Sequence, residues 1–486
     1  MILSIDQGTT GTTCLVFDEE AELVGRGYRE FTQHFPRPGW VEHDAAEIWR
    51  VTEAVAKEAL DDAGVRGGEL QAIGITNQRE TVCVWDRETG EPLHRALVWQ
   101  DRRTAQHCDE LREAGHEPLV RERTGLVLDP YFSGTKIAWL LEHADGLRAK
   151  AEAGRVAFGT IDSWLIFKLT GEHVTDVSNA SRTLLYDIHR GRWDEELCDL
   201  LGVPVDALPE VRPSIGEFGT ASAFGAPVSG VAGDQQAALY GQACLDPGMA
   251  KNTYGTGSFV LLNAGDEPPA EPPQGLLTTI AWGIGRRTVY ALEAAIFVTG
   301  AAVQWLRDGL GILATAAETE ALARGIESTD GVYFVPALTG LGAPDWEPGA
   351  RGTIVGLTRG TTRAHLARAT LEAMAYQTAD AVRAQEEAAG QALTELRADG
   401  GASVNGWLMR FQADVLGVPV VVPEVEQTTA LGAAYLAGVG AGLWSQDRVA
   451  TSWRARSRYE PTMSSDQRQT LLAGWHAAVH TARGHG

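Results

Sequence analysis

The chain opens with apolar runs and short polar turns that predict strands before helices. Residues 1–17 place two apolar runs around a Gly/Thr turn, which predicts a β-hairpin, and residues 22–31 predict a third strand. Residues 45–64 carry apolar side chains at helical spacing, and residues 70–76 are mostly apolar, which is typical of a buried strand. This order indicates an α/β domain.

The second half of the sequence begins in the same way. Pro247 and Gly248 interrupt the preceding pattern, and residues 253–265 then repeat the order of strand, Gly/Thr turn and strand. Further strands are predicted at 276–284 and 286–293. The repeated opening indicates a duplicated unit whose two copies face each other across a cleft.

These patterns set the expected domain limits. We expect a first domain over 1–246, a second over 247–440, and a helical tail over 441–486 that packs on the second domain. Within the tail, the stretch beyond about 445 is predicted to be irregular until a closing helix at 464–482. Two further segments are expected to be a long helix and a proline-rich surface loop, at 362–389 and 266–275.

Composition narrows the class of protein. A length of 486 residues predicts about two to four domains, and a net charge of −23 argues against nucleic acid or an anionic membrane surface as the main partner. No run of about twenty apolar residues occurs, and the N-terminus lacks the pattern of a secretory signal, so we expect no membrane span. The five cysteines are scattered and never form a C-x-x-C pair, which fits a reducing cytoplasm.

Two familiar classes of phosphate site are excluded. Only five lysines occur and none precedes Ser or Thr, so no Walker A loop is present, and no H-R-D or D-F-G triplet of protein kinases appears. If the ligand is a phosphate, its charge must be met by backbone N–H groups, helix N-termini and Mg²⁺.

Four glycine-rich turns carry hydroxyl or amide side chains, at 6–13, 255–258, 297–305 and 399–405. Taken singly, such segments are more often only turns. Taken together they could line a polyphosphate, because glycine permits a close approach of the backbone. Asp6, at the end of the first strand, could hold Mg²⁺ through water or could simply cap its turn.

Polar residues at two further junctions are candidates for chemistry. Asp234 lies between a predicted strand and helix, where the segment alone favours a helix N-cap over a carboxylate that accepts a proton from an attacking alcohol. The adjacent Arg79 and Glu80 follow a buried strand and could hydrogen-bond the neighbouring hydroxyls of a polyol. Trp99 and Tyr131, taken singly, are more often core aromatics than ligand contacts.

These stretches together resemble one enzyme family. From residue 6 to about residue 438 the chain contains, in order, DQGTT, PGWVEHD, GITNQRE, VWQDRR, DPYFSGTK, NASRT, AGDQQAALYGQ, KNTYGTG, GLLTTIAW, QWLRD, TGLGAP, RATLEAMAYQT and ALGAAYLAG. This series is similar to the FGGY carbohydrate kinases, and ITNQRE and PGWVEHD resemble the members that act on glycerol.

The resemblance implies two actin-like (ribonuclease-H-like) α/β ATPase domains that close on an interdomain cleft. It implies the reaction of ATP and glycerol to ADP and sn-glycerol 3-phosphate with Mg²⁺, with Asp234 as the general base and Asp6 and Asp234 toward the metal. Glycerol contacts would come from Arg79, Glu80, Tyr131, Asp234 and Gln235, with Trp99 and Phe259 on the carbon skeleton. The nucleotide would lie on Thr9, Thr10, Gly11, Thr256, Gly300, Gln304, Gly401 and Asn405. The expected partners are glycerol and further copies of the chain, as a dimer or tetramer.

The chain departs from the family pattern at three places. Relatives often carry S-S-R where this sequence has Gly11, Thr12 and Thr13, so we expect weaker ATP binding than in the arginine-bearing relatives. A tyrosine and an aspartate of the family's G-A-P-Y-W-D-P are replaced by Asp345 and Glu347. Residues 220–230 lack the loop that binds fructose bisphosphate in some members and the phosphorylatable histidine of others, so neither regulation is expected.

Three alternatives differ from this interpretation. The nearest is an FGGY kinase for another polyol or sugar. An actin-like or chaperone-like ATPase would need a polymer interface or a peptide-binding domain, for which the tail after residue 440 leaves little room. A catalytically inactive scaffold is disfavoured because Asp6, Arg79, Glu80 and Asp234 are all present.

Overall fold

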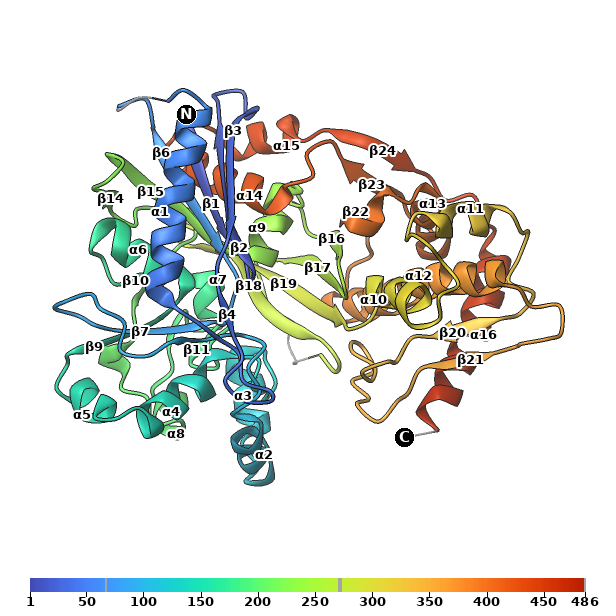
Figure 1. The fold of residues 1–486 in the computed structure, drawn as a ribbon, viewed down its shortest axis with the longest axis horizontal. Coiled ribbons are helices and arrows are strands. Elements are labelled where there is room, and N and C mark those ends of the chain that lie inside the picture. The colour runs from blue at the N-terminus through green and yellow to red at the C-terminus, as the bar shows by residue number, and fades with distance from the viewer. Residues whose placement is uncertain (66–67, 270–272, 485–486) are drawn as a thin grey trace.

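The structure is a computed structural model that describes residues 1–65, 68–269 and 273–484. It is a mixed α/β protein built around two large sheets, one in each half of the molecule (Figure 1). The predicted surface loop at 266–275 lies partly outside the described residues. All five cysteines are free and buried. None of the helices in the described ranges combines the length and the apolar character needed to span a membrane.

The first sheet has the order β14-β15-β6-β1-β2-β3. Its strands are β1 (Ile2–Gln7), β2 (Gly11–Phe17), β3 (Leu23–Glu30), β6 (Ala72–Asn77), β14 (Thr220–Ala221) and β15 (Ala226–Gly233). The first three strands are antiparallel, as the hairpin pattern predicts, whereas β6 and β15 run parallel to β1. Because Gln7 pairs with Asn77 and Asn77 with Gly233, the carboxyl ends of three strands meet at one edge.

The second sheet repeats this plan in the order β18-β19-β17-β16-β22-β23-β24. Its strands are β16 (Met249–Tyr254), β17 (Ser258–Gly265), β18 (Leu277–Ile284), β19 (Arg287–Ile296), β22 (Glu395–Gly400), β23 (Val420–Pro423) and β24 (Ala455–Tyr459). Here β16 and β17 form the opening hairpin, and β22 is parallel to β16, with Tyr254 opposite Gly400. Both halves therefore present a strand-turn-strand hairpin beside the end of a parallel strand.

Smaller elements complete the first half, most of them below its large sheet in the view of Figure 1. A five-stranded sheet and two short pairs consist of β4 (Gln33–His34), β5 (Glu42–His43), β7 (Val82–Asp86), β8 (Ala96–Leu97), β9 (Val156–Thr160), β10 (Val174–Asp176), β11 (Tyr186–Asp187), β12 (Arg192–Trp193) and β13 (Glu210–Arg212). The helices are α1 (Ala45–Asp62), α2 (Ala105–Glu113), α3 (Glu117–Thr124), α4 (Ser133–His143), α5 (Leu147–Glu152), α6 (Ile161–Thr170), α7 (Val177–Ala180), α8 (Glu195–Leu200) and the 3₁₀ turn η1 (Val205–Ala207).

Two helices lie between the large sheets. Helix α9 (Asp234–Gly241) packs against α14 (Thr428–Gly440), and α14 also covers β1, β6 and β15 of the first sheet. Their backbones approach so closely that a Cβ atom on Gly432 would stand 1.8 Å from the Ala237 carbonyl oxygen. On its other face the first sheet is covered by α1, whose buried residues follow the predicted apolar spacing.

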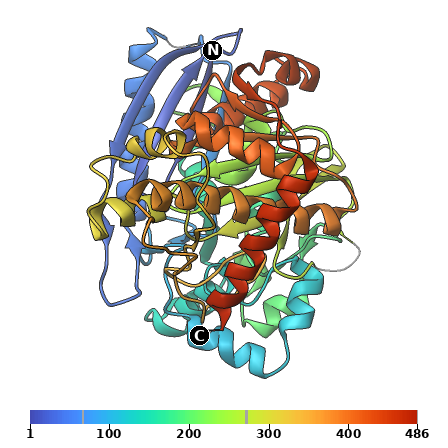
Figure 2. The ribbon, with the colours of Figure 1, turned by 90° about the vertical axis from the view of Figure 1, so that its right-hand side faces the viewer.

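Most of the remaining helices of the second half lie on the side of its sheet that faces away from the first half (Figure 1). The remaining helices are α10 (Gly300–Gln304), the π-helical turn η2 (Trp305–Gly309), α11 (Glu318–Arg324), α12 (Arg363–Ala389), η3 (Gly401–Val404), α13 (Gly406–Leu416), α15 (Gln446–Ser452) and α16 (Ser465–Arg483), with the strand pair β20 (Tyr333–Val335) and β21 (Thr353–Val355). Thr362 caps α12 and Gly390 ends it in a left-handed conformation, so the long helix is confirmed. Figure 2 shows α16 crossing the outer face of this half.

The prediction of an irregular stretch beyond about 445 was wrong. Helix α15 forms there, and β24 pairs antiparallel with β23 as the edge strand of the second sheet. The sequence of β24, ARSRY, has exposed arginines and no run of apolar side chains, as edge strands that avoid aggregation often do. The apolar alternation that identifies a strand is therefore missing.

Candidate active site

The carboxyl ends of β1, β6 and β15 bring the predicted residues of the first half together. Asp6 is the penultimate residue of β1, Arg79 and Glu80 follow β6, and Asp234 follows β15 as the first residue of α9. Parallel strands present their carboxyl ends at the same edge, which is where ligands bind in open α/β sheets. The topology thus places side chains from positions 6, 79 and 234 at one point.

Arg79 is the centre of this cluster. Its Nε lies 3.2 Å from Asp234 Oδ1, and its Nη1 lies 2.6 Å from Glu293 Oε2. Three more hydrogen bonds run from Nη2 to Glu293 Oε1 at 3.2 Å, from Nη2 to the Tyr131 hydroxyl at 3.3 Å and from Nη1 to Gln236 Oε1 at 3.3 Å, and Nε lies 3.7 Å from Glu80 Oε1. A buried guanidinium with this many partners has a fixed orientation.

Glu80 is held beside Arg79 in an unusual backbone conformation. Its φ of 61° lies in the left-handed region, which a glutamate rarely adopts without support from its surroundings. Arg182, which follows α7, donates from Nε to Glu80 Oε1 at 2.7 Å. Burial raises the pKa of Glu80, while Arg79 and Arg182 oppose that shift. Sequence reasoning missed Arg182, although it lies within the NASRT motif.

Glu293 reaches this cluster from β19 of the second sheet and was also missed. Its side chain is fully buried and contacts both Arg79 and Arg182, the latter at 3.0 Å from Nη2 to Oε1. Burial would raise the pKa of Glu293, but Arg182 and Arg79 outweigh that effect and lower the pKa to about 2. An acidic residue inside an otherwise apolar strand was the available signal in the sequence.

The N-cap interpretation of Asp234 is wrong. The N-cap of α9 is Gly233, and Asp234 instead accepts a hydrogen bond from the Gln235 backbone N–H at 2.7 Å. The Asp234 side chain is 32% exposed to solvent, whereas the Arg79 and Glu80 side chains are buried. Burial raises the pKa of Asp234 against the opposing charge of Arg79, which moves this carboxylate toward the range of a general base.

Gln235 contacts Lys251, which was not among the predicted site residues. Lys251 of β16 donates to Gln235 Oε1 and, at 2.9 Å, to the Thr253 hydroxyl. Burial lowers the pKa of Lys251 to about 8. The lysine side chain brings a cation from the second sheet into the neighbourhood of Asp234, whose pKa it lowers.

The predicted aromatic residues differ in their surroundings. Tyr131 and Trp99 meet edge to face with ring centroids 5.6 Å apart, and Trp99 Nε1 donates to the Thr9 hydroxyl at 2.9 Å. Both rings are partly exposed, unlike typical core aromatics. Phe259 lies on β17, which packs against α9, and is itself partly buried against the apolar cluster between the sheets.

The first glycine-rich turn connects β1 and β2. It is closed by the bond from Gly8 N to Gly11 O at 3.0 Å, and Gln78 braces it by donating to the Gly8 carbonyl oxygen at 3.1 Å. Thr9 is partly exposed and Thr10 is exposed, so both are available to a ligand.

The Asp6 carboxyl group is buried near a second carboxylate, that of Asp234. Burial, and then the nearby Asp234 carboxylate, raise the pKa of Asp6 to about 7. Two like charges in one place favour protonation of one of them or binding of a cation. Among the described residues no group of three or more His, Cys, Asp or Glu side chains is placed to hold a metal ion.

The predicted nucleotide residues of the second half gather at the matching edge of its sheet. The turn after β16 contains Thr256, and Gly300 N donates to the Gly255 carbonyl oxygen at 3.1 Å. Gly401 follows β22, whose last residue lies opposite Tyr254. Asn405 caps α13 and donates to the Thr319 hydroxyl at 3.3 Å, whereas Gln304 is exposed on α10.

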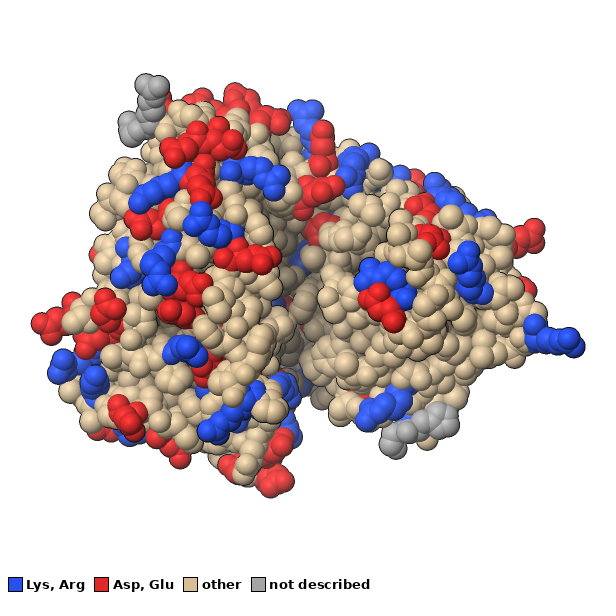
Figure 3. Space-filling model, in the orientation of Figure 1, with Lys and Arg blue, Asp and Glu red and all other residues tan. Residues whose placement is uncertain are grey.

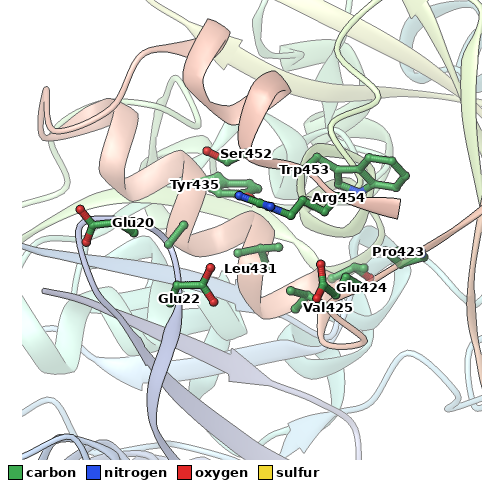
Figure 4. Close-up of a pocket in the computed structure, with 13 residues that line it drawn as sticks. Glu20, Glu22, Pro423, Glu424, Val425, Leu431, Tyr435, Ser452, Trp453 and Arg454 are labelled. Atoms are coloured by element: carbon green, nitrogen blue, oxygen red, sulfur yellow. The ribbon is translucent and has the colours of Figure 1, made fainter. Parts of the chain in front are cut away.

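A groove separates the two halves on the face shown in Figure 3, where basic and acidic side chains are interspersed. A different cavity of about 300 Å³ lies between the β2–β3 turn, α14 and the segment that joins α15 to β24. Figure 4 shows its Arg454 among Tyr435, Glu22 and Glu424. No predicted site residue lines this cavity.

Comparisons with known proteins extend over nearly the whole chain. Residues 1–241 match the N-terminal domain, and residues 250–441 the C-terminal domain, of the FGGY family of carbohydrate kinases. The chain is 59% identical to a glycerol kinase of Dechloromonas aromatica over 485 residues, which cover 98% of this chain and 96% of that protein. A crystal structure of Plasmodium falciparum glycerol kinase with ADP superposes with a TM-score of 0.95 at 36% identity, covering 99% and 98% of the two chains. A gluconate kinase of Lactobacillus acidophilus shares the fold, with a TM-score of 0.89 at 20% identity and coverage of 99% and 97%.

Proposed function

Because the chain belongs to the FGGY family of carbohydrate kinases, we propose that it is a glycerol kinase that transfers the γ-phosphoryl group of ATP to glycerol. The observation that carries this proposal is the cluster of Arg79, Glu80, Tyr131 and Asp234. The partly exposed Asp234 follows β15 at the same sheet edge as the glycine-rich turn after β1, which we call the phosphate turn. The identity of 59% with a glycerol kinase over nearly the full length supports the same substrate.

The proposed glycerol site selects its substrate through hydrogen bonds. Glycerol offers little apolar surface, so discrimination depends on donors and acceptors that a wrong substrate would leave unpaired. Arg79, Glu80, Tyr131, Asp234 and Gln235 supply both kinds of partner for three hydroxyl groups. Trp99 and Phe259 would cover the carbon skeleton and exclude longer sugars by shape.

In the proposed reaction, Asp234 accepts the proton of the terminal glycerol hydroxyl. The hydroxyl oxygen forms a bond to the γ-phosphorus while the bond to the β–γ bridging oxygen breaks, and ADP leaves. Transfer through a loose transition state depends mainly on in-line positioning and charge stabilisation, so the base contributes a smaller share. Burial raises the pKa of Asp234, which makes its carboxylate a stronger base.

The nucleotide would lie between the two sheet edges. Thr9, Thr10 and Gly11 would contact the phosphates from the first sheet, and Thr256, Gly300, Gln304, Gly401 and Asn405 would contact the nucleotide from the second. Asp6 and Asp234 would hold Mg²⁺, which when bound neutralises charge on the transferred phosphate. This chain has Thr13 where relatives often carry an arginine after the phosphate turn. Lys251 would supply a buried positive charge near Asp234 instead.

The domain limits of 1–246, 247–440 and 441–486, assembly as a dimer or tetramer, and a cytoplasmic location remain part of this proposal. The two sheets, each with a strand-turn-strand hairpin beside a parallel strand, support the division into two halves.

A coupled ADP-release assay with the purified protein tests the proposed function. Glycerol, dihydroxyacetone, xylulose and gluconate are each offered at the same Mg-ATP concentration. We expect the highest kcat/KM with glycerol. Preference for xylulose or gluconate would replace glycerol by another FGGY substrate, and ADP release that depends on none of the four would contradict a carbohydrate kinase.

A further inference from the structure

A continuous row of alternating charges runs through the candidate site. It begins at Asp234, passes through Arg79 at 3.2 Å and Glu293 at 2.6 Å, and continues to Arg182 at 3.0 Å and Glu80 at 2.7 Å. We call these five residues the charge row. Its two ends are the carboxylates proposed to contact glycerol, and its middle member, Glu293, comes from the other sheet.

The position of Glu293 is not explained by packing. On β19 it lies opposite Leu277 of β18 and Leu261 of β17, so its own strand neighbours offer it only apolar side chains. A buried row of ion pairs is also a weak source of stability, because apolar residues of similar volume often replace such pairs at no cost. A carboxylate between two guanidinium groups instead fixes their orientation, because each pairing sets the plane of its arginine side chain.

The distances within the charge row separate a firm contact from exchangeable ones. Arg79 is 2.6 Å from Glu293, but its contacts to Asp234, Tyr131 and Gln236 are 3.2 to 3.3 Å long. Hydrogen bonds to Glu293, Tyr131 and Gln236 use the four N–H groups of its two terminal nitrogens, so a glycerol hydroxyl can reach that end of Arg79 only by replacing one of them. The long contacts are the ones that exchange most readily, and the Glu293 contact is the one that keeps the guanidinium in place.

We infer that Glu293 is a positioning residue of the glycerol site, which fixes Arg79 and Arg182 and through them the carboxylates of Asp234 and Glu80. This inference rests on the proposed function, because it assumes that Arg79 and Glu80 bind the substrate. Glu293 belongs to the second sheet, which also carries the turn at Thr256 proposed to bind the nucleotide. The second sheet would therefore orient Arg79, which belongs to the first half.

Steady-state kinetics on the full chain test this role through the difference between two KM values. Glu293→Gln keeps the size of the side chain but removes its charge and one acceptor, so we expect the KM for glycerol to rise by about 10- to 100-fold. The KM for ATP is expected to stay within about twofold, because Glu293 makes no contact with the nucleotide turns. Glu372→Gln is the matched control, a buried glutamate that pairs with Arg368 on α12. We expect it to lower thermal stability without changing the KM for glycerol.

Glu293→Asp keeps the test decisive if Glu293→Gln does not fold. The aspartate retains the negative charge but is one methylene shorter, so it cannot reach both guanidinium groups in the same way. A positioning role predicts a KM for glycerol that remains raised several-fold, whereas a role limited to charge neutralisation predicts the wild-type value.

The inference is overturned if Glu293→Asp has the wild-type KM for glycerol, or if Glu293→Gln loses only thermal stability, as the Glu372→Gln control does. Failure of the proposed function has a different signature, since the wild-type protein would then not phosphorylate glycerol. If the wild type prefers another polyol, the same ratio of variant to wild-type KM is measured for that polyol.

Discussion

At the scale of single residues, Arg79 carries most of the proposed substrate recognition. It contacts Asp234, Tyr131, Gln236 and Glu293, so its removal disorders the glycerol site as a unit. We expect Arg79→Ala to raise the KM for glycerol by at least about tenfold, measured by the coupled assay at saturating ATP. Arg29→Ala, which removes an exposed arginine on β3, serves as the control. An unchanged KM for glycerol in a folded Arg79→Ala protein would contradict the placement of Arg79.

Substitution of Thr13 tests whether the arginine that relatives often carry at this position strengthens ATP binding. It pairs with Asp6 across β1 and β2, and directly opposed residues leave a sheet on the same face, so a side chain at position 13 lies beside Asp6. A guanidinium there can reach the proposed phosphate position. We expect Thr13→Arg to lower the KM for ATP by roughly tenfold, and Thr13→Gln, which has no charge, to leave it unchanged. A raised KM for ATP in Thr13→Arg would refute this account.

Sequence reasoning identified the residues at strand ends better than those elsewhere in the site. Asp6, Arg79, Glu80 and Asp234 could be found because each follows an apolar run that marks a strand. Arg182 and Glu293 were missed despite the signals noted above, because their role depends on contacts between segments far apart in the chain. Their partners become visible only when β19 is placed beside the loop after β6.

At the scale of elements, the contact between α9 and α14 joins the two halves. A Cβ atom at Gly432 would lie 1.8 Å from the Ala237 carbonyl oxygen, so the helices would have to move apart. We expect Gly432→Ala to lower the free energy of unfolding by about 1–3 kcal/mol in urea denaturation. Gly360→Ala is the control, because its nearest non-neighbouring atom would be 3.7 Å away. Equal stability of the two variants would show that the helices are not closely packed.

The elements themselves were predictable where one apolar periodicity continued over their length. The β1–β2 hairpin, α1 and α12 follow their patterns, and Thr362 and Gly390 mark the ends of α12 as capping residues do. Edge strand β24 was missed because its exposed arginines give no alternation. The pairing of helices through Gly241 and Gly432 was equally hidden, since glycine in a helix carries no pattern of its own.

At the scale of the whole molecule, both halves contribute side chains to the proposed substrate site. Glu293 and Lys251 extend from the second sheet to residues proposed to bind glycerol on the first. Nucleotide binding on the second sheet should therefore change the affinity for glycerol. We expect a non-hydrolysable ATP analogue with Mg²⁺ to tighten glycerol binding about 5- to 150-fold in calorimetry, and glycerol to tighten the analogue by the same factor. Equal glycerol affinity with and without the analogue would contradict this coupling.

The central claim is that an alcohol proton passes to Asp234 as the phosphoryl group is transferred. The most direct test compares Asp234→Asn with the wild type, measuring glycerol-dependent ADP release at saturating Mg-ATP and glycerol binding by calorimetry in the same folded preparations. Asparagine keeps the shape of the side chain but cannot accept the proton, so we predict a loss of about 10²- to 10⁴-fold in kcat with glycerol still bound. Near-wild-type turnover by folded Asp234→Asn would remove Asp234 from the role of base and contradict the proposed mechanism.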